Sequence, residues 1–64
     1  MNNVFMNIVI IENEKNETEW VKMDKSGYLY TVYHYVNNCI ERKCIYDDFF
    51  AAVERLKEWE SYFE

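Results

Sequence analysis

The feature that most constrains this chain is a single stretch of helical periodicity near its C-terminal end. Between residues 48 and 63 the apolar residues recur at spacings of three, four and seven, which places them on one side of a helix. Asp47 and Asp48 stand where a carboxylate can cap the first turn. One amphipathic helix cannot bury its stripe alone, so the preceding residues must supply a second layer. The stripe consists of Phe49, Ala52, Val53, Leu56, Trp59 and Phe63.

The residues before this helix predict strands joined by short turns. Residues 28–36 (YLYTVYHYV) are dense in aromatic and β-branched residues and form the clearest strand. Asn37-Asn38 predicts a two-residue hairpin turn into a strand over residues 39–46. A shorter strand over residues 20–24 precedes Lys25-Ser26-Gly27. There the only glycine of the chain suits the positive φ of a three-residue hairpin loop.

The first apolar stretch, residues 4–11, predicts one more strand. Both of its faces are apolar, which is typical of a central strand or of one that pairs with a partner chain. Residues 12–19 (ENEKNETE) follow as an expected exposed loop. The expected fold is therefore α+β, with the order ββββα: a four-stranded antiparallel sheet and one C-terminal helix packed on one face. The pattern leaves open whether the first strand lies beside residues 20–24 or at the far edge.

Length and composition limit the classes of protein to consider. A chain of 64 residues forms one domain, residues 1–64, and its 50% hydrophobic and 19% aromatic content is typical of a globular protein. No apolar run approaches the ~20 residues that a membrane span needs. The start lacks the basic segment and cleavage site of a secretory signal, and two cysteines are too few for a disulfide scaffold. We therefore expect a protein of the reducing cytoplasm.

Charge and motif content argue against nucleic-acid binding and against catalysis. Seven basic and twelve acidic side chains give a net charge of −5, whereas phosphate contacts need a basic surface. His34, Cys39, Glu41 and Cys44 form the only cluster that resembles metal ligands, but it lacks the closely spaced cysteine pair of a zinc site. We expect His34 and Glu41 to form a cross-strand charge pair. The sequence thus predicts no metal, no cofactor and no catalytic residue.

The two turns fix the expected register and therefore the two faces of the sheet. The three-residue loop pairs Met23 with Leu29. The asparagine turn pairs Val36 with Cys39. The face expected beneath the helix carries Val21, Met23, Leu29, Thr31, Tyr33, Tyr35, Ile40, Cys44 and Tyr46. The face expected to stay uncovered carries Trp20, Lys22, Asp24, Tyr28, Tyr30, Val32, His34, Val36, Glu41, Lys43 and Ile45.

The uncovered face is the candidate binding surface. Trp20, Tyr28 and Tyr30 are expected there beside His34, interleaved with charged residues. Tyrosine and tryptophan are enriched at interfaces because they combine a large contact area with a polar group. A mixed patch of this kind predicts a protein partner. The alternatives are that the patch closes a homodimer, or that the rings lie flat on the sheet without a partner.

The acidic residues suggest what kind of partner this surface would meet. An anionic surface can occupy a basic nucleic-acid channel of another protein, and long-range attraction speeds the association. Solubility alone is the alternative explanation for a net charge of this size. The acids form two clusters, Glu12, Glu14, Glu17 and Glu19 in the polar run and Asp47, Asp48, Glu54 and Glu58 along the helix.

These features together resemble a known group of proteins. With its proline-free polar runs ENEKNETE and VNNCIERK and its terminal DDFFAAVERLKEWESYF helix, the chain resembles the small acidic inhibitors of bacterial defence encoded by phages and mobile elements, anti-CRISPR proteins above all. The resemblance implies a non-enzymatic inhibitor in the host bacterial cytoplasm. Such a protein binds a nuclease or its guide complex and occludes a DNA-binding surface. The alternative is a self-associating, antitoxin-like dimeric module.

Overall fold

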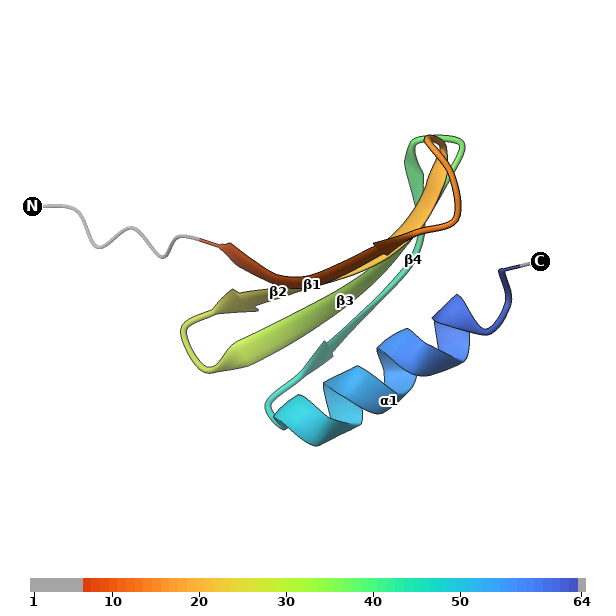
Figure 1. Cartoon of the computed structure of the whole chain (residues 1–64). Helices are drawn as coiled ribbons and strands as arrows, with labels where there is room; N and C mark the ends of the chain where they lie inside the picture. Colours follow the sequence, from red (N-terminus) through yellow and green to blue (C-terminus); the bar gives the residue numbers. More distant parts are fainter. Residues whose placement is uncertain (1–6, 64) are drawn as a thin grey trace, which may run out of the picture.

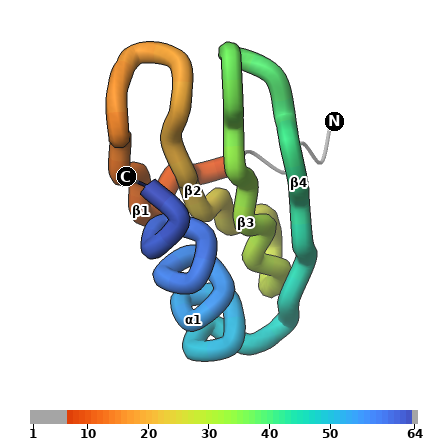
Figure 2. The backbone as a smooth tube through the Cα atoms, turned by 90° about the vertical axis from the view of Figure 1, so that its right-hand side faces the viewer, coloured from red at the N-terminus to blue at the C-terminus, as the bar shows by residue number. Residues whose placement is uncertain are grey.

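A computed structural model describes residues 7–63, which form a four-stranded antiparallel sheet followed by one helix (Figure 1). The strands lie in the order in which they occur along the chain, and the helix lies across one face of the sheet (Figure 2). The α+β class and the ββββα order are therefore those that the sequence predicts. The elements are β1 (Ile8–Glu14), β2 (Glu19–Ser26), β3 (Leu29–Val36), β4 (Cys39–Tyr46) and α1 (Phe49–Glu60).

Helix α1 begins and packs as its apolar stripe predicts. Asp48 is the N-cap, and its Oδ2 atom accepts a hydrogen bond from the backbone N–H of Ala51 at 3.2 Å. The cap satisfies one of the donors that every helix leaves free at its start. The helix buries Ala52, Leu56 and Trp59 against the sheet. The core therefore lies between α1 and one face of the sheet, and consists of Val21, Met23, Val32, Ala52, Leu56 and Trp59.

The turn between β2 and β3 differs from the expected three-residue loop. Ser26 pairs with Leu29, so the turn has two residues, Gly27 and Tyr28. Gly27 has a φ of +64° and occupies the first central position, where type II′ hairpin turns require glycine. Because β2 continues to Ser26, Met23 pairs with Val32 and not with Leu29. The partner of Met23 thus lies three residues further along β3 than expected. Because this shift is an odd number of residues, it turns every side chain of β3 to the other face.

This shift corrects the predicted faces of β3. Tyr30, Val32 and His34 lie beneath α1 and not on the uncovered face. Tyr33 and Tyr35, together with Leu29 and Thr31, lie on the uncovered face and not beneath the helix. Tyr30 packs edge-on against Phe49, with ring centroids 5.6 Å apart. The physical reason is that only the observed register places the small apolar side chain of Val32 opposite Met23 in the core.

A second irregularity affects β4. The asparagine turn is confirmed, because Val36 pairs with Cys39 and both turn residues have positive φ. The register then shifts between His34 and Tyr35, so His34 pairs with Arg42 and the expected pairing with Glu41 is wrong. The inserted residue is a β-bulge, which restores Cys44 to the helix side. Ile40, expected beneath the helix, is 51% exposed.

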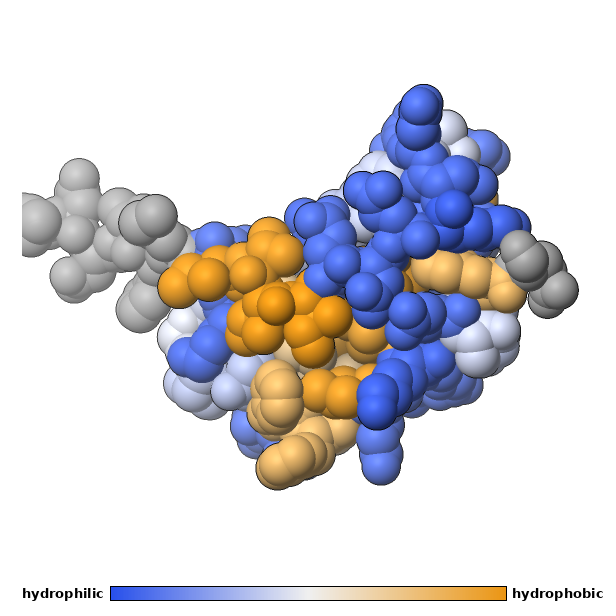
Figure 3. Space-filling view, viewed as in Figure 1, coloured by the Kyte–Doolittle hydropathy of each residue, from blue (hydrophilic) through white to orange (hydrophobic). Residues whose placement is uncertain are grey.

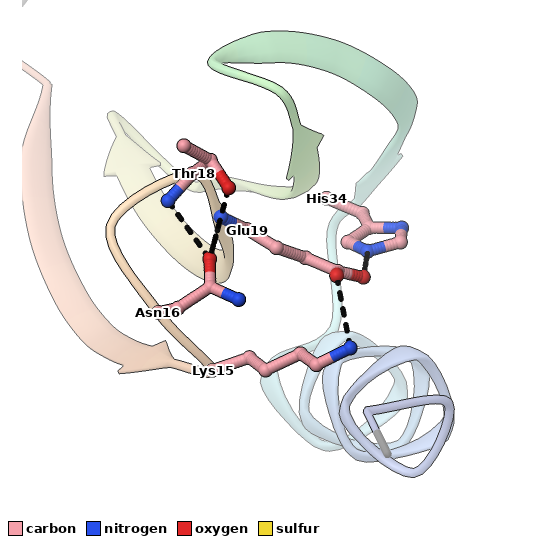
Figure 4. Close-up of polar contacts among 5 residues, drawn as sticks. All are labelled: Lys15, Asn16, Thr18, Glu19 and His34. Carbon is pink, nitrogen blue, oxygen red and sulfur yellow. Dashed lines mark hydrogen bonds and ion pairs between the residues drawn. The ribbon is translucent and has the colours of Figure 1, made fainter.

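Strand β1 pairs with β2 and lies at the edge of the sheet, not at its centre. The predicted strand residues Val4, Phe5 and Met6 lie outside the described residues. The polar run 12–19 is only partly a loop, because its two ends belong to β1 and β2. The connection is tightened by Asn16, whose Oδ1 atom accepts hydrogen bonds from the backbone N–H groups of Thr18 and Glu19 at 2.9 Å (Figure 4).

The cap of α1 gives a direct test of this architecture. Replacing Asp48 with alanine removes the acceptor for the Ala51 N–H and should cost about 1 kcal/mol of stability. For a domain of this size, that loss lowers the melting temperature by about 4–8 °C. The matched control is Asp47→Ala, because Asp47 is an exposed carboxylate one residue earlier that does not cap the helix. Equal effects of the two substitutions in thermal denaturation would contradict the assigned cap.

Candidate binding surface

Three aromatic side chains form a continuous cluster on the uncovered face. Trp20 and Tyr35 pair across β2 and β3, and their rings stack with centroids 4.6 Å apart and planes inclined by 11°. Tyr33 follows at 5.9 Å from Tyr35. We call Trp20, Tyr33 and Tyr35 the aromatic cluster. The three side chains are only partly buried, so the cluster presents ring surface on the side of the sheet that lacks a helix.

A lysine of the same face lies over these rings. The Nζ atom of Lys22 is 5.3 Å from the ring centroid of Tyr33 and 5.5 Å from that of Tyr35. The ring faces carry partial negative charge, so they attract a cation at this distance. The sequence places Lys22 here because it pairs with Tyr33 and stands two residues from Trp20. The cluster therefore offers a partner both ring surface and a positive charge.

Asp24 lies on this face beside the aromatic cluster and is almost fully buried. Its exposed fraction is 6%, and among the described residues its Oδ1 atom has no hydrogen-bond partner. It pairs with Val9 of β1 and Thr31 of β3. A buried carboxylate oxygen without a donor is energetically costly. Burial, and then the nearby charge of Asp24, raise the pKa of Tyr33 above its ordinary value of 10.0.

His34 belongs to a different site, at the opposite side of the sheet. It is 3% exposed and lies beside the rings of Trp59 and Phe63. Its Nε2 atom is 3.1 Å from Oε2 of Glu19, whose other oxygen is 3.5 Å from Nζ of Lys15 (Figure 4). The hydrogen bond from His34 lowers the pKa of Glu19, burial opposes this effect, and the charge of Lys15 adds to it. This network links β2, β3 and the preceding loop, so its evident role is structural.

The acidic side chains do not converge on one surface. Glu12 and Glu14 pair with Lys22 and Trp20, and therefore share the uncovered face with the aromatic cluster. Of the other predicted acids, Glu17 lies in the loop before β2, Glu19 is the first residue of β2, and the remaining four lie just before or along α1. Three of them have structural contacts within the chain: Glu19 with His34 and Lys15, Asp48 with the start of α1, and Glu58 with Arg55 and Tyr62. Of the two predicted clusters this leaves Glu17, Asp47 and Glu54, which are exposed.

The structure thus brings together only part of the predicted site. Trp20 lies on the uncovered face with Glu12 and Glu14, whereas Tyr30 and His34 lie beneath α1. Tyr28 stands in the β2–β3 turn and is 74% exposed. The other two residues of the aromatic cluster, Tyr33 and Tyr35, were expected beneath α1 and therefore were not part of the predicted site. A two-residue turn that begins with glycine was the signal for them, since it shifts β3 to the register observed.

A second exposed feature is apolar and lies along β1. Ile8, Val9 and Ile10 are 61%, 49% and 40% exposed, and we call these three residues the apolar edge. Figure 3 shows apolar surface over β1 that continues toward the first turns of α1, where Phe50 is 74% exposed. Exposed apolar residues that gather in one area mark interaction surfaces more often than scattered ones do.

The described residues contain no group of three or more His, Cys, Asp or Glu side chains that could hold a metal ion. Cys39 and Cys44 are both free thiols. No helix within residues 7–63 is long and apolar enough to cross a membrane. Between α1 and the end of β4, a shallow hollow contains Arg55, which donates to the Tyr46 hydroxyl and to Glu58, each at 2.8 Å. Arg55 thus pairs with two of the polar groups that line the hollow, and the exposed Glu54 lines it as well.

Comparison with known proteins gives no relative. No protein-family model matches the chain, and neither the curated proteins nor the solved structures gave a significant match.

The Glu19 network predicts part of the pH dependence of stability. The folded-state pKa of Glu19 lies below its ordinary value of 4.5, so its contribution to stability is present above that value and is lost as the pH falls through the folded pKa. Replacing Glu19 with glutamine should flatten the loss of stability on acidification, measured by urea denaturation from neutral to acidic pH. The control is Glu17→Gln, which replaces an exposed acid in the loop just before β2 and should keep the wild-type profile. Identical profiles for Glu19→Gln and wild type would contradict the assignment.

Proposed function

We propose that this protein is a non-enzymatic binding module that attaches to another protein through its uncovered sheet face. The observation that supports this function is the aromatic cluster, three partly exposed rings on the side of the sheet opposite α1. Tryptophan and tyrosine dominate the binding energy of protein interfaces, especially where they lie near the centre of the contact. Trp20 and Tyr35 lie on the middle two strands, one pair from the end of the β2–β3 ladder, so they would anchor such a contact near that end of the sheet.

The charge of the chain favours a basic partner. The net charge is −5, and Glu12 and Glu14 border the aromatic cluster on the β1 side. A nucleic-acid-binding groove is a basic surface, and attraction between opposite charges would speed the association of this acidic chain with it. Following the resemblance to anti-CRISPR proteins, we propose that the partner is a bacterial defence nuclease or its guide complex. The protein would occlude the groove as a stoichiometric inhibitor.

In the proposed inhibition the acids contribute less to the contact than the aromatic cluster does. Of the two predicted acidic clusters, only Glu12 and Glu14 share the face with the aromatic cluster, and Asp24 on that face is buried, so the surface does not reproduce the regular charges of a DNA backbone. Peripheral charges mainly change the rate of association, whereas buried contacts govern dissociation. In this proposal the rings hold the complex together, and the acids guide the protein toward the groove.

Alanine substitutions in the aromatic cluster test the proposal. Wild-type protein is tested by native mass spectrometry against a panel of purified CRISPR nucleases, with and without guide RNA. Trp20→Ala and Tyr35→Ala should each weaken the complex about 30-fold or more, the loss expected for a residue worth about 2 kcal/mol. Tyr62→Ala is the matched control, because Tyr62 is an exposed tyrosine that follows α1. Circular dichroism confirms that each variant is folded.

Two results would contradict the proposed function. One is the absence of a complex with every nuclease of the panel. The other is a complex that forms but responds equally to Tyr35→Ala and Tyr62→Ala, which would place the contact elsewhere. Glu12→Gln with Glu14→Gln should slow association at low salt and leave dissociation nearly unchanged, and salt should reduce the difference.

A further inference from the structure

The backbone of β1 has an open side. Within residues 7–63, β1 pairs with β2 alone, and α1 packs on β2, β3 and β4. The N–H and C=O groups of one side of β1 are therefore available to another strand, next to the exposed apolar edge. The other outer strand, β4, differs from β1, because Glu41, Arg42 and Lys43 place charges of both signs along its middle. Charged side chains protect a sheet edge from pairing, and the apolar edge lacks them.

We propose that β1 pairs with β1 of a second copy of this chain in antiparallel orientation, so that the two sheets join into one. The apolar residues of β1 occupy both of its faces. Val9 lies in the row of Asp24 on the uncovered face, and Ile11 lies in the row of Met23 beneath α1, because the β1–β2 register shifts between Val9 and Ile11. A strand added beside it must be apolar on both faces as well. The N-terminal half of β1 itself has this property.

The charges of β1 lie toward one end of the strand. Glu12 and Glu14 both lie in its C-terminal half, and the apolar edge lies in its N-terminal half. Parallel pairing of two copies would place like carboxylates on adjacent strands, about 5 Å apart. Antiparallel pairing centred on Val9 separates the two Glu12 residues by about 20 Å along the strands, well beyond the screening length of about 8 Å. The pattern is therefore self-complementary about a two-fold axis, as a symmetric dimer requires.

The dimer would also change how the proposed binding surface is used. A two-fold axis perpendicular to the joined sheet keeps both uncovered faces on the same side. The two aromatic clusters would then face one direction, and a partner with two equivalent sites could engage both at once. The dimer itself does not depend on the proposed function, because its evidence is the edge of β1 and not the aromatic cluster.

The oligomeric state in solution tests this proposal. Sedimentation equilibrium of the wild-type protein should give a mass of two 7.9 kDa chains, falling to one chain on dilution. Ile10→Lys places a charge in the apolar edge and should give one chain at every concentration. Ile45→Lys is the matched control, since Ile45 is an exposed isoleucine of the other outer strand, and this variant should remain dimeric. Circular dichroism checks that both variants are folded.

Cysteine cross-linking tests the orientation in a Cys39→Ser, Cys44→Ala background. Antiparallel pairing centred on Val9 brings the two copies of residue 9 within disulfide distance and keeps the two copies of residue 13 far apart. Val9→Cys should therefore cross-link on oxidation, and Asn13→Cys should not. A wild-type monomer at all concentrations, or a dimer that Ile10→Lys leaves intact, would overturn the proposal. Equal cross-linking at both positions would overturn the antiparallel arrangement.

Discussion

The pairing of Met23 with Val32 beneath Leu56 determines the rest of this structure. The chain has one core, and a sheet places alternate side chains on alternate faces, so this one pair decides which residues of β2 and β3 meet the helix. Gly27 makes the pairing possible, because a two-residue turn with positive φ at its first position closes β2 and β3 in that register. Once Val32 is in the core, Tyr33 and Tyr35 must lie on the other face.

The same constraint explains why two surfaces, the aromatic cluster and the apolar edge, remain exposed. A single helix of twelve residues covers the middle of one face, and it leaves the other face and the open side of β1 without protein contacts among the described residues. A chain of this length buries only about 60% of the surface that its unfolded form exposes. Contact with other molecules would bury the aromatic cluster and the apolar edge, and the two proposals assign a different partner to each.

Much of the fold follows from local patterns in the sequence. The stripe of α1, the Asp48 cap and the asparagine turn were predictable because each depends on a few neighbouring residues. The faces of β3 were not, because Lys25-Ser26-Gly27 is compatible with more than one loop length and an odd shift of register exchanges the faces. The bulge in β4 has no local signal that would have revealed it. Of the predicted aromatic site, Trp20 therefore lies on the uncovered face, whereas Tyr30 and His34 lie beneath α1. The prediction did not include Tyr33 and Tyr35.

The most direct test of the account is the β2–β3 register in solution, measured by nuclear Overhauser effects on the labelled protein. The account predicts cross-strand contacts between Met23 and Val32, and contacts between the rings of Tyr30 and Phe49. It also predicts that the ring of Tyr35 contacts Trp20 and no residue of α1. Contacts between Met23 and Leu29, with Tyr33 or Tyr35 against α1, would contradict it and would remove the basis for the aromatic cluster as a binding surface.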